Sequence, residues 1–405
     1  MPNDRGTGRI PQLWWWRLFV VVALSTCLGA IARSADVPKP LTVSDGADQA
    51  ACPKLFAVQD RAFVVWVSTS YKGAVVTRTL RCRRLLAGGR VGEAVRIKAP
   101  DIAGLPQMDW VATGGARGLI MHPQTGSHRR NGEPQEYAAN GWLFDSASGT
   151  FDVEGEECSP LDCPKAGSAS AGDSEGQTGS EGRPAATSPI CYVQTPHYSY
   201  VAGTTRDGDA ALSILNRALG SVTRYGLVSQ RGVPQCMAWL GGSTLLMALA
   251  DRPTPGGLWF DEEGLRVPDM IHWPRPCRIT CSVTKDLGIT WRAGSLPYAQ
   301  ANAVETAGTV DGQGRVWVVT TAVVNKEDER TCLFLSVSAD GGDTWSKPAR
   351  ITSGEALDRQ PSAVVFGNSL HVAFSRREGG VSRVRYLAMG SVDQLYGRLR
   401  VLTTK

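Results

Sequence analysis

Six stretches of the chain share one pattern of apolar and polar positions. In each stretch a run of small and apolar residues leads to a Gly-containing or polar turn, and a second, more apolar run follows. The runs have the length and the β-branched and aromatic content of strands, and a proline opens most of them, which is tolerated at the first position of a strand. The six copies begin at Pro53, Pro106, Pro196, Pro234, Val304 and Pro361. Apolar residues on both faces predict sheets packed between neighbouring sheets.

Two octamers in the C-terminal half share a second pattern, in which a hydroxyl residue, Asp, Gly, Thr and Trp stand at fixed spacing. Their aspartates, Asp286 and Asp340, lie 54 residues apart. An aspartate at the start of a tight turn accepts backbone N–H groups, and glycine tolerates left-handed dihedrals. The tryptophan that ends each octamer is then free to pack against a neighbouring sheet. The patterned positions are Thr284, Asp286, Gly288, Thr290, Trp291, Ser338, Asp340, Gly342, Thr344 and Trp345.

These octamers resemble the Asp-box, the Ser/Thr-x-Asp-x-Gly-x-Thr-Trp turn of sialidases and of other propellers with the same repeat. The resemblance implies an all-β, six-bladed β-propeller of the sialidase type over residues 50–405. It also implies that the boxes stabilise the blades and lie away from any active site. The apolar segment Leu399–Thr403 could supply a strand that closes the ring.

The N-terminus predicts an export signal over residues 1–32. Arg5, Arg9 and Arg17 precede the apolar run Leu18–Ala32, and small residues at its end suit cleavage. The alternative is a lipid anchor at Cys27, because the four residues that end there resemble a bacterial lipoprotein box. We therefore expect an exported protein that is secreted, periplasmic or on the cell surface, with membrane contact only through this N-terminal region.

Charge and cysteine content exclude several functions. Lys and Arg total 43 against 38 for Asp and Glu, and this near-neutral balance argues against a nucleic-acid partner. The ten cysteines include no Cys-x-x-Cys pair, so we expect no metal site and no cofactor. The pairs Cys158 with Cys163 and Cys277 with Cys281 are interpreted as local disulfides or buried thiols.

Residues 158–191 are rich in Ser, Gly, Ala, Pro and Glu, and we expect a low-complexity loop there because such a segment buries little apolar surface. In a propeller, the chain segments that enter the innermost strands converge near the central axis, so residues at these positions are predicted to face a ligand. The candidates are Lys54, Gln107, Asp109, His197, Gln235, Glu305, Arg359 and Gln360.

The resemblance also implies what catalysis would require. Sialidases hold a carboxylate with three arginines and use a tyrosine nucleophile paired with a glutamate, and an aspartate as acid/base. Here the Arg-Ile-Pro expected before the first blade is replaced by Cys52–Lys54, and the tyrosine expected at the last blade by Gln360–Ser362. Glu305 resembles the setting of the glutamate, although Thr320–Thr321 replaces the arginine that often ends the following strand.

Two functions remain open. The favoured hypothesis is a binding module that holds a glycan or protein ligand at the central positions, with Gln107, His197, Arg359 and Gln360 as ligand-binding candidates. The alternative is a diverged glycoside hydrolase in which Asp109 and Glu305 act as acid and base.

Each candidate also has a structural interpretation. Arg359 could pair with an acid such as Asp358, and Glu305 could be a solvated turn residue. Asp109 stands beside Trp110, which could belong to the core, and His197 could belong to strand packing.

Overall fold

The computed structural model describes residues 39–97, 191–251, 278–296, 303–325 and 330–401, the first two ranges with short gaps, and the backbone of four strands between 109 and 152. The predicted export signal with Cys27 lies outside the described residues, as does the expected low-complexity loop up to residue 190. Within the described residues, no helix is long and apolar enough to cross a membrane.

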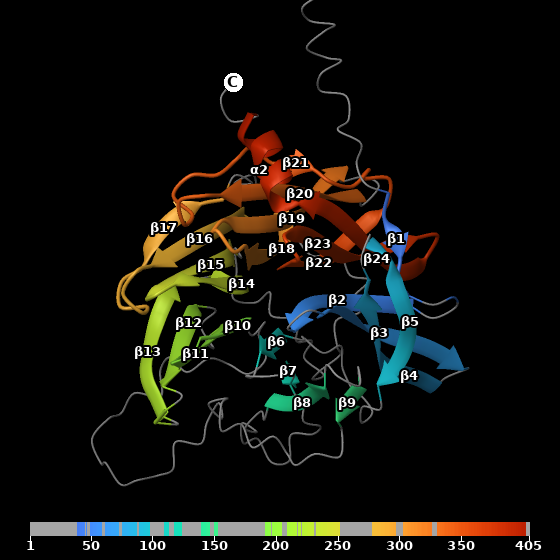
Figure 1. Cartoon of the computed structure of the whole chain (residues 1–405), viewed down its shortest axis with the longest axis horizontal. Coiled ribbons are helices and arrows are strands. Elements are labelled where there is room, and N and C mark those ends of the chain that lie inside the picture. The colour runs from blue at the N-terminus through green and yellow to red at the C-terminus, as the bar shows by residue number, and fades with distance from the viewer. Residues whose placement is uncertain are drawn as a thin grey trace, which may run out of the picture. The chain divides into compact units, whose positions relative to one another are not determined.

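The described residues form six four-stranded antiparallel sheets and one helix (Figure 1). The all-β prediction is confirmed, and the number of sheets equals the number of repeated stretches in the sequence. Five sheets are built of four consecutive strands. From first to fourth strand, the first sheet consists of β2 (Gln49–Val58), β3 (Arg61–Lys72), β4 (Val75–Leu85) and β5 (Val91–Ile97), and the second sheet of β6 (Asp109–Ala112), β7 (Arg117–Pro123), β8 (Ala139–Asp145) and β9 (Thr150–Asp152). The third sheet consists of β10 (Cys191–Gln194), β11 (Tyr198–Thr204), β12 (Ala210–Asn216) and β13 (Ser221–Ser229), and the fourth sheet of β14 (Gly232–Gly241), β15 (Thr244–Asp251), β16 (Arg278–Thr284) and β17 (Arg292–Ser295). The fifth sheet consists of β18 (Ala303–Val310), β19 (Val316–Asn325), β20 (Arg330–Ser338) and β21 (Ala349–Arg350), and the sixth and last sheet of β22 (Leu357–Phe366), β23 (Ser369–Glu378), β24 (Val381–Ser391) and β1 (Leu41–Thr42).

Three of the prolines that open the repeated stretches lie inside first strands and not at their starts. Pro53, Pro234 and Pro361 are within β2, β14 and β22, each at a register shift where the first strand has one residue more than its partner. Val304 occupies the corresponding shift in β18. Proline suits a bulge because the residue there is left out of the hydrogen-bond ladder. In these four stretches the sequence pattern identified a first strand but placed its start at the bulge.

The third sheet begins earlier than the sequence pattern suggested. Its first strand is β10, which starts at Cys191, whereas the expected start, Pro196, falls between β10 and β11. The stretch taken as a first strand is the second strand, β11, which carries the fully buried Tyr200. The short, four-residue β10 directly after a polar segment gave too weak an apolar signal to be recognised.

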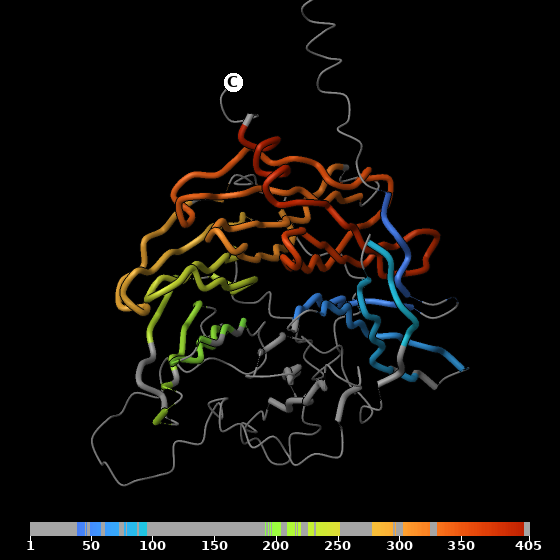
Figure 2. Tube along the Cα trace, viewed as in Figure 1, coloured from blue at the N-terminus to red at the C-terminus, as the bar shows by residue number. Residues whose placement is uncertain are grey.

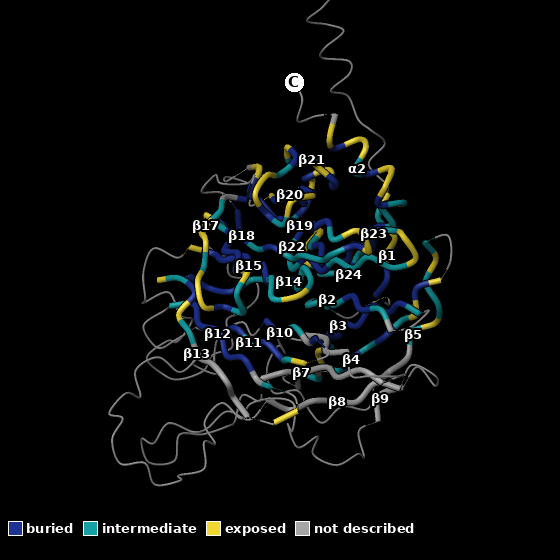
Figure 3. The backbone as a smooth tube through the Cα atoms, turned by 60° about the vertical axis from the view of Figure 1, so that its left-hand side comes forward, coloured by how far each residue is buried: buried dark blue, intermediate teal, exposed yellow. Residues whose placement is uncertain are grey.

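Neighbouring sheets pack through apolar faces, and the second strands β3, β15 and β23 are buried along most of their length (Figure 3). The first strands contact one another in succession, from β2 through β6, β10, β14 and β18 to β22, and β22 in turn contacts β2. Figure 2 shows this last approach as the first sheet, in blue, beside the last sheet, in red. Trp66 of β3 and Tyr386 of β24, both almost fully buried, share one apolar cluster between these two sheets.

An N-terminal strand completes the last sheet. β1 pairs antiparallel with β24, and the next residue, Val43, is fully buried and donates its backbone N–H to the Val384 carbonyl at 2.8 Å. The expectation that Leu399–Thr403 supplies a closing strand is wrong, because Val392–Val401 forms helix α2. Val392, Leu395 and Leu399 lie on one face of α2 and pack into the cluster between the fifth and sixth sheets. Asp393 in the first turn and Arg398 and Arg400 in the last turn suit the helix dipole.

The hydrogen bonds expected of the two octamers are present. Asp286 accepts the backbone N–H of Thr290 at 2.9 Å and its hydroxyl at 2.6 Å, while the Thr284 hydroxyl donates to Asp286 and accepts the Gly288 N–H. The hydroxyl and backbone donations from Thr290, with that of Thr284, lower the pKa of Asp286 to about 2. The second octamer repeats every one of these bonds with Ser338, Asp340, Gly342 and Thr344.

The tryptophan of each octamer packs toward the preceding sheet. Trp291 lies against a cluster that includes Tyr200 and Leu212 of the third sheet, and Trp345 lies against one that includes Leu246 of the fourth sheet. Both octamers follow third strands, and Ser338 pairs in register with Val316, which pairs with Val310 at the end of β18. The octamers therefore lie at the end of the sheets opposite to the starts of the first strands.

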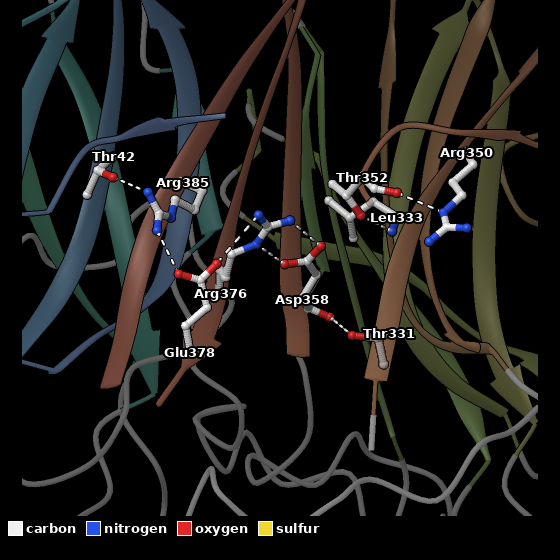
Figure 4. Close-up of polar contacts among 9 residues, drawn as sticks. All are labelled: Thr42, Thr331, Leu333, Arg350, Thr352, Asp358, Arg376, Glu378 and Arg385. Atoms are coloured by element: carbon white, nitrogen blue, oxygen red, sulfur yellow. Dashed lines mark hydrogen bonds and ion pairs between the residues drawn. The ribbon is translucent and has the colours of Figure 1, made fainter. Parts of the chain in front are cut away.

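A buried ion pair joins the start of β22 to the end of β23 in the last sheet, and further charged side chains extend from it toward the surface (Figure 4). Arg376 donates two hydrogen bonds to the fully buried Asp358, at 2.6 and 2.9 Å. These bonds hold the pKa of the Arg376 guanidinium above its ordinary value, although burial alone would lower it. Glu378 lies 3.7 Å from Arg376 and accepts a hydrogen bond from Arg385, which also bonds to Thr42 of β1. Asp358 is therefore the partner of Arg376 and not of Arg359.

Candidate functional site

Charged and polar side chains from three different sheets meet near the starts of first strands. We name Cys52, Glu305, Arg359, Gln360 and Ser375 the first-strand cluster. Glu305 comes from β18, and Arg359 from β22 donates to both of its carboxylate oxygens, from Nη2 at 2.6 Å and from Nε at 3.2 Å. The Glu305 side chain is 24% exposed and that of Arg359 15%, so this ion pair is accessible to solvent but mostly covered.

Gln360 connects the remaining members of the first-strand cluster. Its backbone N–H donates to Glu305 Oε2 at 2.6 Å. Its side-chain oxygen accepts the Cys52 backbone N–H and the Ser375 hydroxyl, both at 2.8 Å, and its amide nitrogen lies 3.4 Å from Cys52 Sγ. One glutamine thus joins β2, β18, β22 and β23.

The bulges of β2 and β22 explain why these side chains converge. Cys52 and Gln360 both have a φ of 53°, and each directly precedes the proline of its bulge. A left-handed conformation costs a non-glycine residue about 1–2 kcal/mol, and such residues are concentrated at functional sites. The two bulges bring equivalent backbone positions of two neighbouring first strands close together. The side-chain amide of Gln360 can therefore bond from one strand to the other.

The surroundings of Cys52 disfavour the thiolate form of its side chain. Burial raises its pKa to about 12, against the opposing effect of nearby Lys54. A thiol with so high a pKa stays protonated near neutral pH, and the thiolate is the reactive form. The first-strand cluster therefore offers a carboxylate, a guanidinium and an amide as its working groups.

Other sequence candidates lie elsewhere or outside the description. Gln235 in β14 turns back onto its own strand, where its amide nitrogen donates to the Val233 and Pro234 carbonyls. His197 is exposed in the turn between β10 and β11. This turn follows the end of a first strand, whereas the first-strand cluster lies near the starts of first strands. Asp109 begins β6, whose backbone alone is described, and Gln107 lies outside the described residues.

Of the residues predicted to face a ligand, the structure brings Glu305, Arg359 and Gln360 together. Cys52 and Ser375, which bond to Gln360, were not among the predicted residues. A signal for Cys52 was present, because Cys52-Pro53 repeats the residue-proline pattern of Gln360-Pro361. Ser375 gave none, since it lies within the second strand β23, opposite Arg359 in the register.

The described residues contain no group of three or more His, Cys, Asp or Glu side chains that could hold a metal ion. An open hollow lies over β4 and β5, lined by Arg83, Val91, Gly92, Glu93 and Ala94. These strands belong to the first sheet and carry no member of the first-strand cluster.

The fold and the cluster define an all-β protein of six antiparallel sheets in which first strands bring together charged and polar side chains. No family profile matches the chain, and no curated protein matches it in sequence. Among solved structures, Trypanosoma rangeli sialidase aligns with a TM-score of 0.51 and 11% identity over 91% of this chain and 60% of that one. The same sialidase with the inhibitor DANA gives a TM-score of 0.50 and 10% identity over the same shares.

The chain therefore has a sialidase-like fold, and it spans about 60% of the length of these sialidase structures. Sequence identity this low concerns the fold alone, and function has to be argued from the site.

Proposed function

We propose that this protein is a six-bladed β-propeller that binds a glycan or a protein ligand at the first-strand cluster, without standard sialidase catalysis. The succession of contacts between first strands, with β22 against β2, supports a closed ring of blades. The repeated hydrogen bonds around Asp286 and Asp340 support Asp-boxes in the fourth and fifth blades.

The observation that carries the binding function is the engagement of Glu305. Arg359 donates to both carboxylate oxygens, and the Gln360 N–H occupies Oε2 as well. The resemblance to sialidases implies a tyrosine nucleophile at the position of Gln360. A side-chain amide cannot be activated for nucleophilic attack as the phenol hydroxyl of tyrosine can. The mostly covered but solvent-accessible ion pair suits recognition of hydroxyl and carboxyl groups, because guanidinium and carboxylate together offer directed donors and acceptors.

The alternative is a diverged glycoside hydrolase that uses Asp109 and Glu305. The observation in its favour is that Glu305 and Gln360 do meet, as the glutamate and tyrosine of sialidases do. Such a mechanism needs two carboxylates roughly 5 to 10 Å apart, one of them able to donate a proton. Glu305 would first have to leave Arg359.

A panel of fluorogenic glycosides, sialosides included, separates the two functions. We expect no turnover by the purified protein, together with binding of at least one member of a glycan array that Arg359→Ala weakens about tenfold or more, through loss of a charge-assisted contact. Turnover that Glu305→Gln abolishes would establish the hydrolase instead. Glycan binding that is insensitive to both substitutions would remove the first-strand cluster from the function.

We further propose export, with residues 1–32 removed or with a lipid anchor at Cys27. The basic residues before the apolar run of the leader support this location. Intact-mass analysis of the natural protein distinguishes the two routes, because cleavage beyond Ala32 removes Cys27 whereas lipidation retains it with added mass. A native protein that retains residue 1 and carries no lipid would contradict both.

A further inference from the structure

His371 of β23 is a buried histidine whose two ring nitrogens are both engaged. The residue is 8% exposed. Its Nδ1 lies 2.5 Å from the Tyr386 hydroxyl, and its Nε2 lies 3.3 Å from the Phe366 carbonyl oxygen. Because a carbonyl oxygen only accepts, Nε2 carries the hydrogen and donates to Phe366, which leaves Nδ1 to accept the Tyr386 hydroxyl. These two contacts together require the neutral ring.

The ring of His371 faces the first sheet. Side chains two positions apart on a strand share a face, and both Ala373 and Tyr386 belong to the apolar cluster between the first and last sheets. The His371 ring stacks on that of Tyr386, with centroids 5.9 Å apart and planes 12° apart. Opposite His371 in the register is Ala388, and a Cβ added at Gly89, between β4 and β5, would lie 2.9 Å from its Cβ. His371 is therefore part of the contact between the two sheets.

A second proton on the ring is incompatible with this contact. Nδ1 would become a donor, so the Tyr386 hydroxyl would lose its acceptor. Burial disfavours the imidazolium and lowers the pKa of His371, although the bond to the Phe366 carbonyl opposes the shift. Burial also raises the pKa of Tyr386 to about 12, so the phenol stays protonated and supplies no negative charge.

The charged residues of the first sheet that face this interface would repel an imidazolium. Arg81 and Arg83 stand opposite Trp66 and Val64 in the register of β4 with β3, and directly opposite residues share a face of the sheet. Trp66 and Val64 both belong to the cluster shared with the last sheet. The one acidic residue within β3, β4 and β5 is Glu93, which is exposed. The first sheet thus adds to the cost of a charge on His371.

The last sheet offers His371 no ion pair from its described strands. Uncharged residues of β22 and β24 stand opposite it, namely Val364 and Ala388. Arg359 and Arg377 share its face, but in the register they lie four and six positions away, about 13 Å or more at the usual rise of a strand. Arg376, five positions along β23, points to the other face. The carboxylates of β22 and β23 contact Arg376 on that other face, and they are Asp358 and Glu378.

We propose that the contact between His371 and Tyr386 makes the interface between the first and last sheets sensitive to mild acid. Uptake of a proton on Nδ1 of His371 breaks this contact, and the two sheets lose their packing near His371 before the whole protein unfolds. The proposal concerns the closure of the fold and does not rest on the ligand-binding function proposed above.

Two hydrogen bonds across this interface connect the acid response to the first-strand cluster. The Leu55 N–H donates to the Ser362 hydroxyl at 2.9 Å, and Ser362 stands opposite the residue two positions beyond His371. Further along the same strands, the Cys52 N–H donates to the Gln360 side chain at 2.8 Å. Separation of the sheets in acid therefore releases β2 from the first-strand cluster.

The direction of the response follows from the lowered pKa of His371. An opened segment takes up a proton on this histidine below about pH 6.5, whereas the closed interface keeps the ring neutral, so the interface loses stability as the pH falls from that value. The octamer aspartates respond in a separate range, since the pKa of Asp286 is about 2. Mild acid thus acts on one interface and not on the turns.

Amide hydrogen exchange of the full chain, resolved by residue and expressed as protection factors, tests the proposal. Between pH 7 and 5.5 we expect the protection of the Leu55 and Cys52 amides to fall at least about threefold. The Leu333 amide, which donates to the Thr352 hydroxyl beside the fifth sheet, serves as the internal reference and should keep its protection. An equal fall at all three amides would assign the effect to general acid destabilisation and overturn the proposal.

His371→Gln and His197→Gln form a matched pair of variants. Glutamine does not titrate, and its amide can still donate to the Phe366 carbonyl, so His371→Gln should show the same Leu55 protection at pH 7 and 5.5. His197 is exposed, and His197→Gln should retain the full acid response. The same acid response in both variants would exclude His371 as its origin.

A direct titration of the unmodified protein covers the case in which His371→Gln does not fold. The imidazole signal of His371 in NMR spectra, recorded as the pH is lowered, should keep the position of the neutral ring with hydrogen on Nε2 below the pH at which the exposed His197 becomes protonated. Titration of both histidines over the same pH range would contradict the proposed coupling between the ring and the closed interface.

Discussion

Glycine at the third patterned position of each octamer is required by both backbone conformation and packing. Gly342 has a φ of 98°, and a Cβ there would lie 2.7 Å from Leu246 Cδ1 and 3.3 Å from Val283 Cγ2. Leu246 is fully buried, so it has little room to yield. The close approach exists because the turn packs onto the preceding sheet, which is how a local turn holds two sheets together.

Gly342→Ala is therefore expected to destabilise the protein by about 2–4 kcal/mol, from the left-handed φ and from overpacking together. Gly241→Ala is the matched control, because Gly241 has a φ of 108° but open space around its Cβ position. The control should cost only the conformational part, about 1–2 kcal/mol. Denaturant unfolding measures both, and equal losses would show that the contact with Leu246 contributes nothing.

At the scale of elements, the short strand β1 contributes more than its two residues suggest. Val43 and Ser44 continue it into the interface between the first and last sheets, where both are buried. The Val384 N–H donates to the Ser44 hydroxyl at 3.1 Å, and the Ser382 N–H donates to the side-chain oxygen of Gln49. Residues more than 300 positions apart are thereby bonded, so the N-terminal segment holds the last sheet beside the first.

Val43→Ala should lower the free energy of unfolding by about 2 kcal/mol, because it removes fully buried apolar surface and leaves a cavity. Leu41→Ala in the same segment is the control. Leu41 is 42% exposed, and a surface truncation of this kind is expected to cost less than about 0.5 kcal/mol. Thermal unfolding compares them, and similar losses for both would mean that the segment does not anchor the last sheet.

At the scale of the whole molecule, several turns depend on ionised carboxylates. Hydrogen bonds from Thr290 lower the pKa of Asp286 from 3.8 to about 2. Those from Arg315 and Asn368 lower that of Asp393. Burial alone would raise the pKa of Asp340, but the bonds from Thr344 outweigh it, and its pKa too is lowered. Turns in separate sheets are therefore expected to lose stabilising hydrogen bonds over the same acidic pH range.

Stability is consequently expected to fall as the pH drops from about 4 to 2. In this pH window the carboxylates of the unfolded chain bind protons, whereas those with a lowered pKa in the folded chain stay ionised. Each lowered pKa therefore contributes stability above a pH of about 3.8, and this contribution is lost as the pH falls toward 2. Urea midpoints at pH 7, 4 and 3 measure the effect. The double variant Asp286→Asn, Asp340→Asn should be less stable at pH 7 and lose less on acidification. A parallel decline of both proteins would contradict this origin of the acid sensitivity.

Part of the site could be read from the sequence and part could not. Glu305, Arg359 and Gln360 were predictable because they stand near the starts of strands in a recurrent pattern. The partner of Arg359 was not predictable. The neighbouring Asp358 is closer in sequence, but consecutive residues of a strand point to opposite faces, and Asp358 pairs with Arg376 across the sheet. Cys52 and Gln360 are in contact but lie 308 residues apart in the sequence. The only sequence feature that relates them is that each is followed by a proline.

The sequence by itself indicated most of the strands, the six repeated stretches and the two hydrogen-bonded turns, because these depend on alternation along the chain and on bonds between residues four positions apart. Only the tertiary structure decided which bulges meet, that Val392–Val401 forms α2 and not a strand, and that β1 is the strand that pairs with β24. Those outcomes depend on packing between residues hundreds of positions apart, where many pairings satisfy the same local pattern and the burial of a shared apolar interface selects one.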